Sequence, residues 1–160
     1  MSITKLNNLS ISAVTALPSG VGGKVLQIVT NTRATALTTT STSFIDSGLS
    51  ASITPSSASN KILVLVNLNS CTTSSNNGDA CGMQIVRGAT SIFNDSWFIF
   101  NSGTVTLQAN AGSFNYYDSP STTSSTTYKV QVKCRTNSID INANGAGGAI
   151  ASLTLLEIAA

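Results

Sequence analysis

Much of this 160-residue chain alternates between apolar and polar positions with a period of two, the pattern typical of β-strands. The stretch from Tyr128 to Arg135 is the clearest case, because four apolar residues alternate there with four polar or basic ones. It predicts a half-buried strand with a basic outer face. Residues 61–69 give the strongest strand signal, and their first half is apolar at successive positions. That run predicts a central strand covered on both faces.

Further strands are predicted along the rest of the domain, separated by connectors rich in Ser, Asn, Gly and Pro. Residues 25–29 form a short apolar run, and residues 149–159 form a last apolar strand. The apolar positions of that last strand change face after Leu155, which indicates a bulge or burial on both sides. Weaker strand signals lie near 34–40, 43–54, 81–87, 91–100, 104–109, 113–118 and 137–142.

No amphipathic helix pattern is sustained anywhere, so the sequence predicts an all-β fold. About eight to ten short strands at this spacing are typical of an antiparallel β-sandwich or barrel. The strongest strands should supply the core, and the side chains expected to be buried are Ile62, Val64, Val66, Tyr128, Val130 and Val132.

Residues 1–17 differ from the rest of the chain and are followed by the run Pro-Ser-Gly-Val-Gly-Gly at 18–23. We interpret 18–23 as a flexible joint, because this composition does not hold a helix and hardly holds a strand. The β domain is then 24–160, and 1–17 is an extended N-terminal arm; a frayed terminus is the alternative interpretation. The arm carries six aliphatic residues that would order against another surface, and these are the predicted attachment residues: Ile3, Leu6, Leu9, Ile11, Val14 and Leu17.

Composition narrows the function classes further. Charged residues make up only 9% of the chain and the formal net charge is +2, whereas 25 Ser and 21 Thr supply most of the polarity. The eight Lys and Arg residues never cluster, so no nucleic-acid footprint is visible. The chain has no His, which removes the Ser-His-Asp and Cys-His machineries and most zinc sites. Neither a signal peptide nor a long apolar segment is evident, which predicts cytosolic synthesis and no membrane insertion.

Candidate chemistry is sparse. The carboxylates lie on separate, turn-like segments, at Asp46, Asp79, Asp95, Asp118, Asp140 and Glu157. Dispersed carboxylates do not suggest the acid–base pair of a glycosidase, so we predict no enzymatic activity, no cofactor and no metal. Cys71 and Cys81 flank a nine-residue loop and could form a disulfide. Two small buried apolar side chains are the favoured interpretation of this pair, and Cys134 is predicted to lie in the core.

Aromatic residues concentrate between positions 93 and 117. They could anchor an interface or stack on sugar rings, or they could fill one end of the core. Trp97 and Phe98 cannot both point inward in a regular strand. The candidate interface or glycan-binding aromatics are Trp97, Phe98, Phe100, Tyr116 and Tyr117.

Four blocks taken in order carry a family resemblance: Gly23–Val29, Ser43–Val66, Asp118-Ser-Pro followed by Thr126–Val132, and Leu153–Ala160. This succession resembles a group of small virion proteins of tailed bacteriophages, especially phages of marine bacteria and cyanobacteria. Such proteins are described as tail-fibre-like or as phage structural proteins. The resemblance covers roughly residues 23–160 and transfers no catalytic motif. It implies a jelly-roll-like β domain that is often trimeric.

The resemblance and the arm together give a functional hypothesis. The chain is expected to be a virion structural protein at the virion surface, made in the host cytoplasm. A capsid decoration (cement or head-fibre) protein, attached by its arm to the major capsid protein or another virion protein, is favoured. A tail-fibre or receptor-binding tip protein that recognises a host-surface glycan is the alternative, and a carbohydrate-binding module is a second one. The low charge and the apolar strands 61–66 and 149–158 also predict a homo-oligomer, with a trimer favoured by the resemblance.

Overall fold

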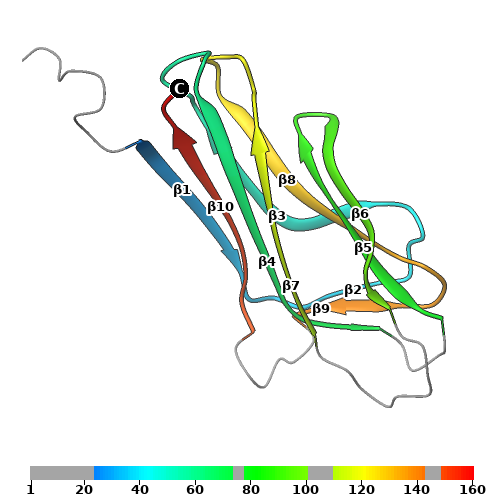
Figure 1. Cartoon of the computed structure of the whole chain (residues 1–160). Helices are drawn as coiled ribbons and strands as arrows, with labels where there is room; N and C mark the ends of the chain where they lie inside the picture. The colour runs from blue at the N-terminus through cyan, green and yellow to red at the C-terminus, as the bar shows by residue number, and fades with distance from the viewer. Residues whose placement is uncertain (1–23, 74–77, 101–109, 143–148) are drawn as a thin grey trace, which may run out of the picture.

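In the computed structural model, which describes residues 24–73, 78–100, 110–142 and 149–160, the chain is all-β and antiparallel (Figure 1). The expected strands are present wherever the structure describes the chain. The strands are β1 (Val25–Arg33), β2 (Leu37–Thr39), β3 (Ile45–Ile53), β4 (Lys61–Thr73), β5 (Ala80–Arg87), β6 (Thr90–Phe100), β7 (Asn110–Asp118), β8 (Thr126–Cys134), β9 (Ile139–Ile141) and β10 (Ala151–Ile158).

The strands form two layers. In one sheet β1, β10, β4 and β7 are neighbours, and the far end of β4 also pairs with β9, which pairs with β2. The other sheet has the order β3-β8-β5-β6. Pairing is nested, because β1 pairs with β10, β3 with β8, β4 with β7, and β5 with β6. Eight strands nested in this way and divided between two sheets make a jelly roll. The sandwich predicted from the sequence is therefore confirmed.

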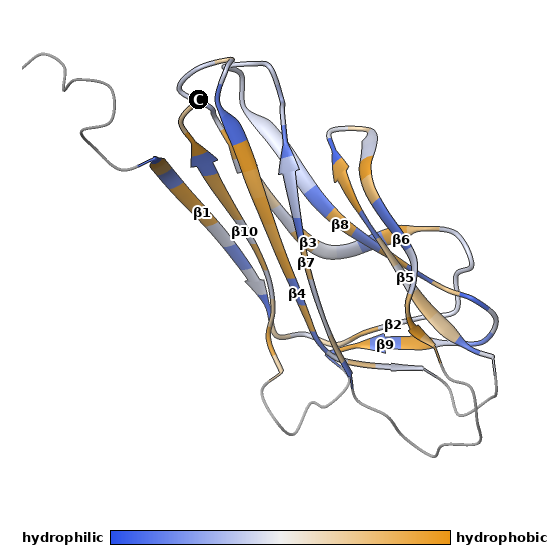
Figure 2. Ribbon diagram, in the orientation of Figure 1, coloured by the Kyte–Doolittle hydropathy of each residue, from blue (hydrophilic) through white to orange (hydrophobic). Residues whose placement is uncertain are grey.

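The core lies between the sheets, and the inward faces of β4 and β8 supply nine of its buried residues. All six predicted core residues are at most 2% exposed. On β8 the burial alternates regularly from Tyr128 to Cys134, as the sequence pattern predicts. Figure 2 shows the apolar stretch of β4 running through the middle of its sheet. The aliphatic residues of β10, Leu153 and Leu155, face the same core.

Two expectations about apolar strands differ from what a single chain shows. β4 is central, but the chain itself covers only its inner face, because Leu65 is 38% exposed on the outer side and Leu63 is only half buried. β10 contains no bulge, and its burial alternates without interruption. The register irregularity lies instead on its neighbour β1, between Val25 and Gln27. The sequence pattern changes face there only because the inward position after Leu155 is a buried carboxylate, Glu157.

The three cysteines are free thiols buried in the core, so Cys71 and Cys81 are not joined. Cys81 lies directly opposite Cys134 on the neighbouring strand β8. Burial raises the pKa of the Cys71 thiol to about 12, which keeps it protonated at neutral pH. The predicted arm 1–17, the joint 18–23 and the strand near 104–109 lie outside the described residues.

Candidate functional surfaces

Glu157 is the most deeply buried acid of the first sheet and closes the end of the sandwich where β1 begins. Its carboxylate accepts hydrogen bonds from the Ser56 amide and hydroxyl, both at 2.7 Å, and from Asn60 Nδ2 at 2.6 Å. Gln27 Nε2 donates to the other oxygen at 2.6 Å. Burial would raise the pKa of this carboxyl, but the bonds from Asn60, Gln27 and Ser56 outweigh it and lower the pKa to about 2. A carboxylate held ionised in this way stabilises the fold and is a poor proton carrier.

Asp79 has a comparable role at the other end of the molecule. It is fully buried, and its Oδ1 atom accepts from the amides of Ala80 and Thr136, at 3.0 and 3.3 Å. The amide of Ser138 donates to Oδ2 at 3.3 Å. Asp79 therefore fixes the turn between β8 and β9 through backbone donors, a structural use of an acid.

A third buried network joins the two sheets through Asp118 on β7. Tyr128, which is fully buried on β8, donates its hydroxyl to Asp118 Oδ2 at 2.6 Å. Arg87 Nη1 lies 2.8 Å from both carboxylate oxygens and also donates to the Ser119 carbonyl. Burial and the hydrogen bond to Asp118 both raise the pKa of Tyr128 far above its ordinary value. The sequence placed none of these three networks, because most of their donors come from other segments of the chain.

The outer face of the β3-β8-β5-β6 sheet is polar and internally hydrogen-bonded. Asp46 accepts from Gln131 Nε2 at 2.7 Å and from Lys129 Nζ at 3.1 Å. Gln131 in turn accepts from Gln84, and Gln84 Oε1 accepts from the Ser91 hydroxyl. The bonds from Gln131 and Lys129 lower the pKa of Asp46. One ladder of side chains thus crosses all four strands of this face.

Beside the ladder, a basic side chain of β8 and another just after the strand lie over aromatic rings. Lys133 Nζ is 4.6 Å from the ring centroid of Phe44 and 4.8 Å from that of Trp97, and Arg135 lies over Phe100 at 5.5 Å. Trp97 reaches the outer face because β6 departs from regular register opposite β5, between Asp95 and Ile99. These are cation–π contacts on a water-facing surface.

The structure does not bring the five predicted aromatics together. Trp97 and Phe100 are 41% and 52% exposed on the outer face of the second sheet, whereas Tyr117 is 56% exposed on β7 in the first sheet. Phe98 packs at the edge of the core, 5.0 Å from the ring of Phe114. Tyr116 also packs against the core. The expectation that Trp97 and Phe98 do not both point inward is confirmed.

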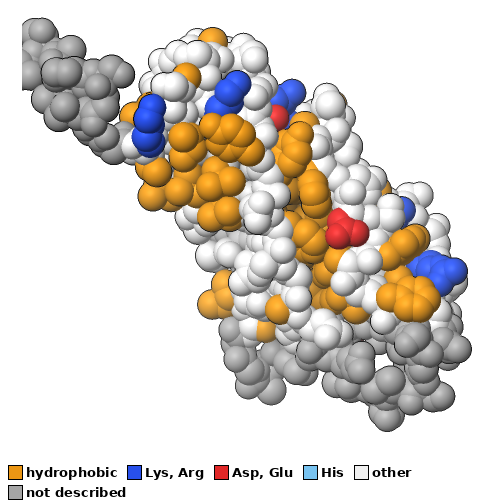
Figure 3. All heavy atoms as spheres, in the orientation of Figure 1, with side chains coloured by type: hydrophobic (Ala, Val, Ile, Leu, Met, Phe, Trp, Pro, Cys, Tyr) orange, Lys and Arg blue, Asp and Glu red, His pale blue; other side chains and the backbone are white. Residues whose placement is uncertain are grey.

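The outer face of the β1-β10-β4-β7 sheet is different, because its half nearest residue 24 is apolar. The strand registers place Ile28 beside Leu156, Leu156 beside Leu63, and Leu63 beside Tyr117. This row crosses all four strands. Figure 3 shows the resulting apolar patch with Lys and Arg side chains at its margin. We call the patch the apolar face; its residues are Val25, Leu26, Ile28, Leu63, Leu65, Tyr117, Leu156 and Ile158.

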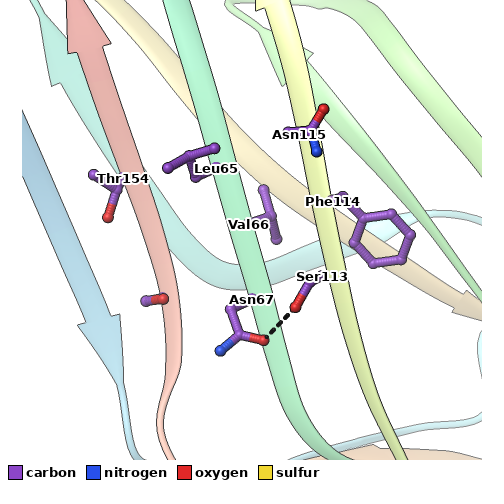
Figure 4. A pocket seen from close by; sticks show the side chains of 8 residues that line it. Leu65, Val66, Asn67, Ser113, Phe114, Asn115 and Thr154 are labelled. Carbon is purple, nitrogen blue, oxygen red and sulfur yellow. Dashed lines mark hydrogen bonds between the residues drawn. The ribbon is translucent and has the colours of Figure 1, made fainter. Parts of the chain in front are cut away.

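Polar side chains continue the same surface farther along the sheet. Leu65 is flanked by Thr154 on β10 and Asn115 on β7. The next row contains Asn67, whose Oδ1 accepts a hydrogen bond from the Ser113 hydroxyl at 3.0 Å (Figure 4). A shallow open hollow of about 350 Å³ lies over these residues. It carries no titratable side chain, so it offers shape and hydrogen bonds without acid–base chemistry.

No three His, Cys, Asp or Glu side chains in the described ranges lie together so as to hold a metal ion. Across the same part of the chain, no helix is long and apolar enough to cross a membrane.

Comparisons with known proteins add a fold-level similarity. No protein-family model matches the chain, and no curated protein matches it. Among solved structures, T=1 particles derived from infectious bursal virus match at a TM-score of 0.45 and 15% identity, over 83% of this chain and 36% of that one. The VP2 subviral particle of infectious bursal disease virus matches at 0.44 and 16%, over 84% of this chain and 38% of that one. This chain therefore spans little more than a third of those proteins. Its class, a jelly-roll β-sandwich, rests on its own strand order.

Proposed function

We propose that this chain is a non-enzymatic structural protein of a bacteriophage virion, and within that class a capsid decoration protein. The observation that carries the proposal is the organisation of the domain. Its buried acids Glu157, Asp79 and Asp118 are held by hydrogen bonds in structural roles, while an apolar outer face lies where the chain enters from residues 1–23. Such a domain is suited to bind other proteins through its surfaces and not to catalyse a reaction. The family resemblance of residues 23–160 supports the virion assignment.

Attachment is assigned to the arm. Ordering a segment of this kind costs about 1–2 kcal/mol per residue, while burying each aliphatic side chain returns about 1.5–3 kcal/mol. A single arm would therefore bind weakly. Several arms presented by one oligomer would bind firmly, because the first contact raises the effective concentration of the others. The residues proposed to insert into the major capsid protein, or another virion protein, are Ile3, Leu6, Leu9, Ile11, Val14 and Leu17.

Deletion of residues 2–17 tests the attachment. The shortened protein should keep the melting temperature of the full chain and should no longer be incorporated into particles. A full-length control in which the polar arm residues Lys5, Asn7 and Asn8 are changed to Ser should still be incorporated. Decoration also predicts hundreds of copies per purified virion, against at most tens for a fibre. If the shortened protein still decorates particles at full occupancy, the attachment site lies on the β domain and not on the arm.

A receptor-binding tip protein that recognises a host-surface glycan is the second candidate. It is favoured by the exposure of Trp97 and Phe100 beside the polar ladder of Asp46, Gln131 and Gln84, since sugar sites pair an aromatic platform with polar groups. A glycan array read with the full chain tests this function. Binding that is lost in Trp97→Ala and kept in Tyr117→Ala would support it, and a blank array would remove it.

A further inference from the structure

We propose that the apolar face is covered by a second copy of this chain, so that it forms the contact of a homo-oligomer. This inference does not depend on a virion role. It concerns only the outer side of the β1-β10-β4-β7 sheet, in the half nearest residue 24. Five of the eight large apolar side chains exposed in the described part of the chain belong to this one face.

The exposures at this face are high for side chains in regular strands. Ile28 is 62% exposed and Tyr117 is 56% exposed, and they stand at the two ends of the row that crosses the sheet. Leu156 and Leu63 fill the row between them. Leu65, in the next row, is 38% exposed. The surface is therefore continuous rather than a set of scattered apolar residues.

The size of the face fits an ordinary subunit contact. From their exposed fractions, its side chains present on the order of 500 Å² of apolar surface, at the upper end of what a monomer leaves contiguous. A standard interface buries about 800 Å² per partner, and about 65% of a homodimer interface is apolar. Such an interface needs roughly 500 Å² of apolar surface, which this face supplies. The neighbouring polar residues Thr30, Thr154 and Asn115 can form part of the rim.

Charge favours a second copy over an unrelated partner. The eight residues of the face include no Asp or Glu, and Lys24 and Lys61 lie at its margin. Lys61 already donates to the Ser119 hydroxyl at 2.9 Å. An uncharged apolar surface is complementary to itself and needs no oppositely charged partner. The outer face of the other sheet shows the contrast, because there Asp46, Gln131 and Gln84 bond one another and face water.

The apolar face lies next to the point where the β domain begins, so a contact between copies also affects where their N-terminal arms start. Val25 follows Lys24 directly, so packing apolar faces together brings the first described residues of all copies close to the contact. Arms starting there would act on one patch of a binding surface, which is the arrangement that multivalent attachment requires.

Sedimentation velocity on the full chain, from about 1 to 100 µM, tests the proposal, since the mass of a reversible oligomer depends on concentration. The wild type should sediment with a mass of at least twice 16.4 kDa at the higher concentrations. The double variant Ile28→Thr/Leu63→Thr keeps β propensity but removes the centre of the face, and should dissociate roughly 100-fold more readily. Ile150→Thr is the matched control, because Ile150 is 48% exposed but lies outside the face. It should keep the wild-type mass.

Cross-linking keeps the proposal testable if the double variant folds poorly. Tyr117→Cys should be joined between copies by a short bis-maleimide, and Ile150→Cys should not. A wild type of 16.4 kDa throughout the range would overturn the inference, as would a double variant that keeps the oligomer or equal cross-linking at the two positions. The decoration proposal is tested separately, by incorporation into particles, whereas a monomeric wild type would also remove the argument for attachment through several arms.

Discussion

Changing Glu157 to Gln removes one charge from a fully buried site without changing its shape. The carboxylate accepts four hydrogen bonds, from Ser56, Asn60 and Gln27. In the variant the new NH₂ group replaces an acceptor and faces side-chain donors. Bonds to a charged acceptor are also stronger than those to a neutral amide. The substitution should therefore weaken a contact between β10, β1 and the turn before β4.

The magnitude follows from the pKa of Glu157, which is lowered from 4.5 to about 2. At about 1.4 kcal/mol per pH unit, this shift corresponds to about 3 kcal/mol of stability at neutral pH. Because Gln27 and Ser56 lie at the rim, where solvent screens the charge, we expect a loss of about 2 kcal/mol for Glu157→Gln. In a chain of this size, that lowers the melting temperature by roughly 4–8 °C.

The pH dependence gives a sharper test. The folded pKa lies below the unfolded value, so the stabilisation is fully present above about pH 5 and is lost as the pH falls toward 2. Urea unfolding at pH 7 and near pH 2.5 should show a large difference between wild type and variant that shrinks in acid. Asp46→Asn is the control, since that carboxylate is 53% exposed and should change stability by less than about 1 kcal/mol. A difference that stays constant with pH would refute the role given to the Glu157 charge.

Two further predictions concern the core. Val64→Ala should lower the free energy of unfolding by about 1–3 kcal/mol, because the variant loses buried apolar surface and leaves a small cavity. Thr38→Ala, at an exposed position, is the control and should change the free energy of unfolding by less than about 0.5 kcal/mol. Equal effects of the two substitutions in urea titrations would mean that the faces of β4 are misassigned. The thiols of Cys71, Cys81 and Cys134 are buried, so the native protein should not react with an aromatic disulfide reagent at pH 8. In denaturant the same reagent should detect three reactive thiols per chain. Rapid reaction in the native state would contradict their placement.

Local patterns predicted much of this fold because strands carry a readable period. The alternation from Tyr128 to Arg135 gave both the strand and its inward face, and the apolar run at 61–69 gave a central strand. The same run also predicted that both faces of this strand are buried, whereas the chain itself buries only the inner face. An apolar position shows only that water is unfavourable there, and it does not say whether the chain itself or another copy excludes that water.

The buried acids mark the limit of sequence patterns. Glu157 reads as a polar position inside an apolar strand, which suggested a change of face at Leu155. Its burial depends on Ser56 and Asn60, about a hundred residues earlier in the chain. No local sequence pattern predicts hydrogen-bond donors that lie so far away along the chain. The candidate aromatics are divided for a similar reason, since residues near in sequence, such as Phe100 and Tyr117, belong to different sheets.

The nested strand order also dictates when the protein can fold during synthesis. β10 is the last strand in chain order, yet it lies between β1 and β4 in the first sheet. Val25 pairs with Ile158, so β1 has no sheet neighbour until nearly the whole domain has left the ribosome. Contacts of such long range make folding slow and leave apolar strands open to chance association in the meantime. Nonsense or frameshift mutations in the codons for 151–158 would therefore remove a middle strand rather than a dispensable tail.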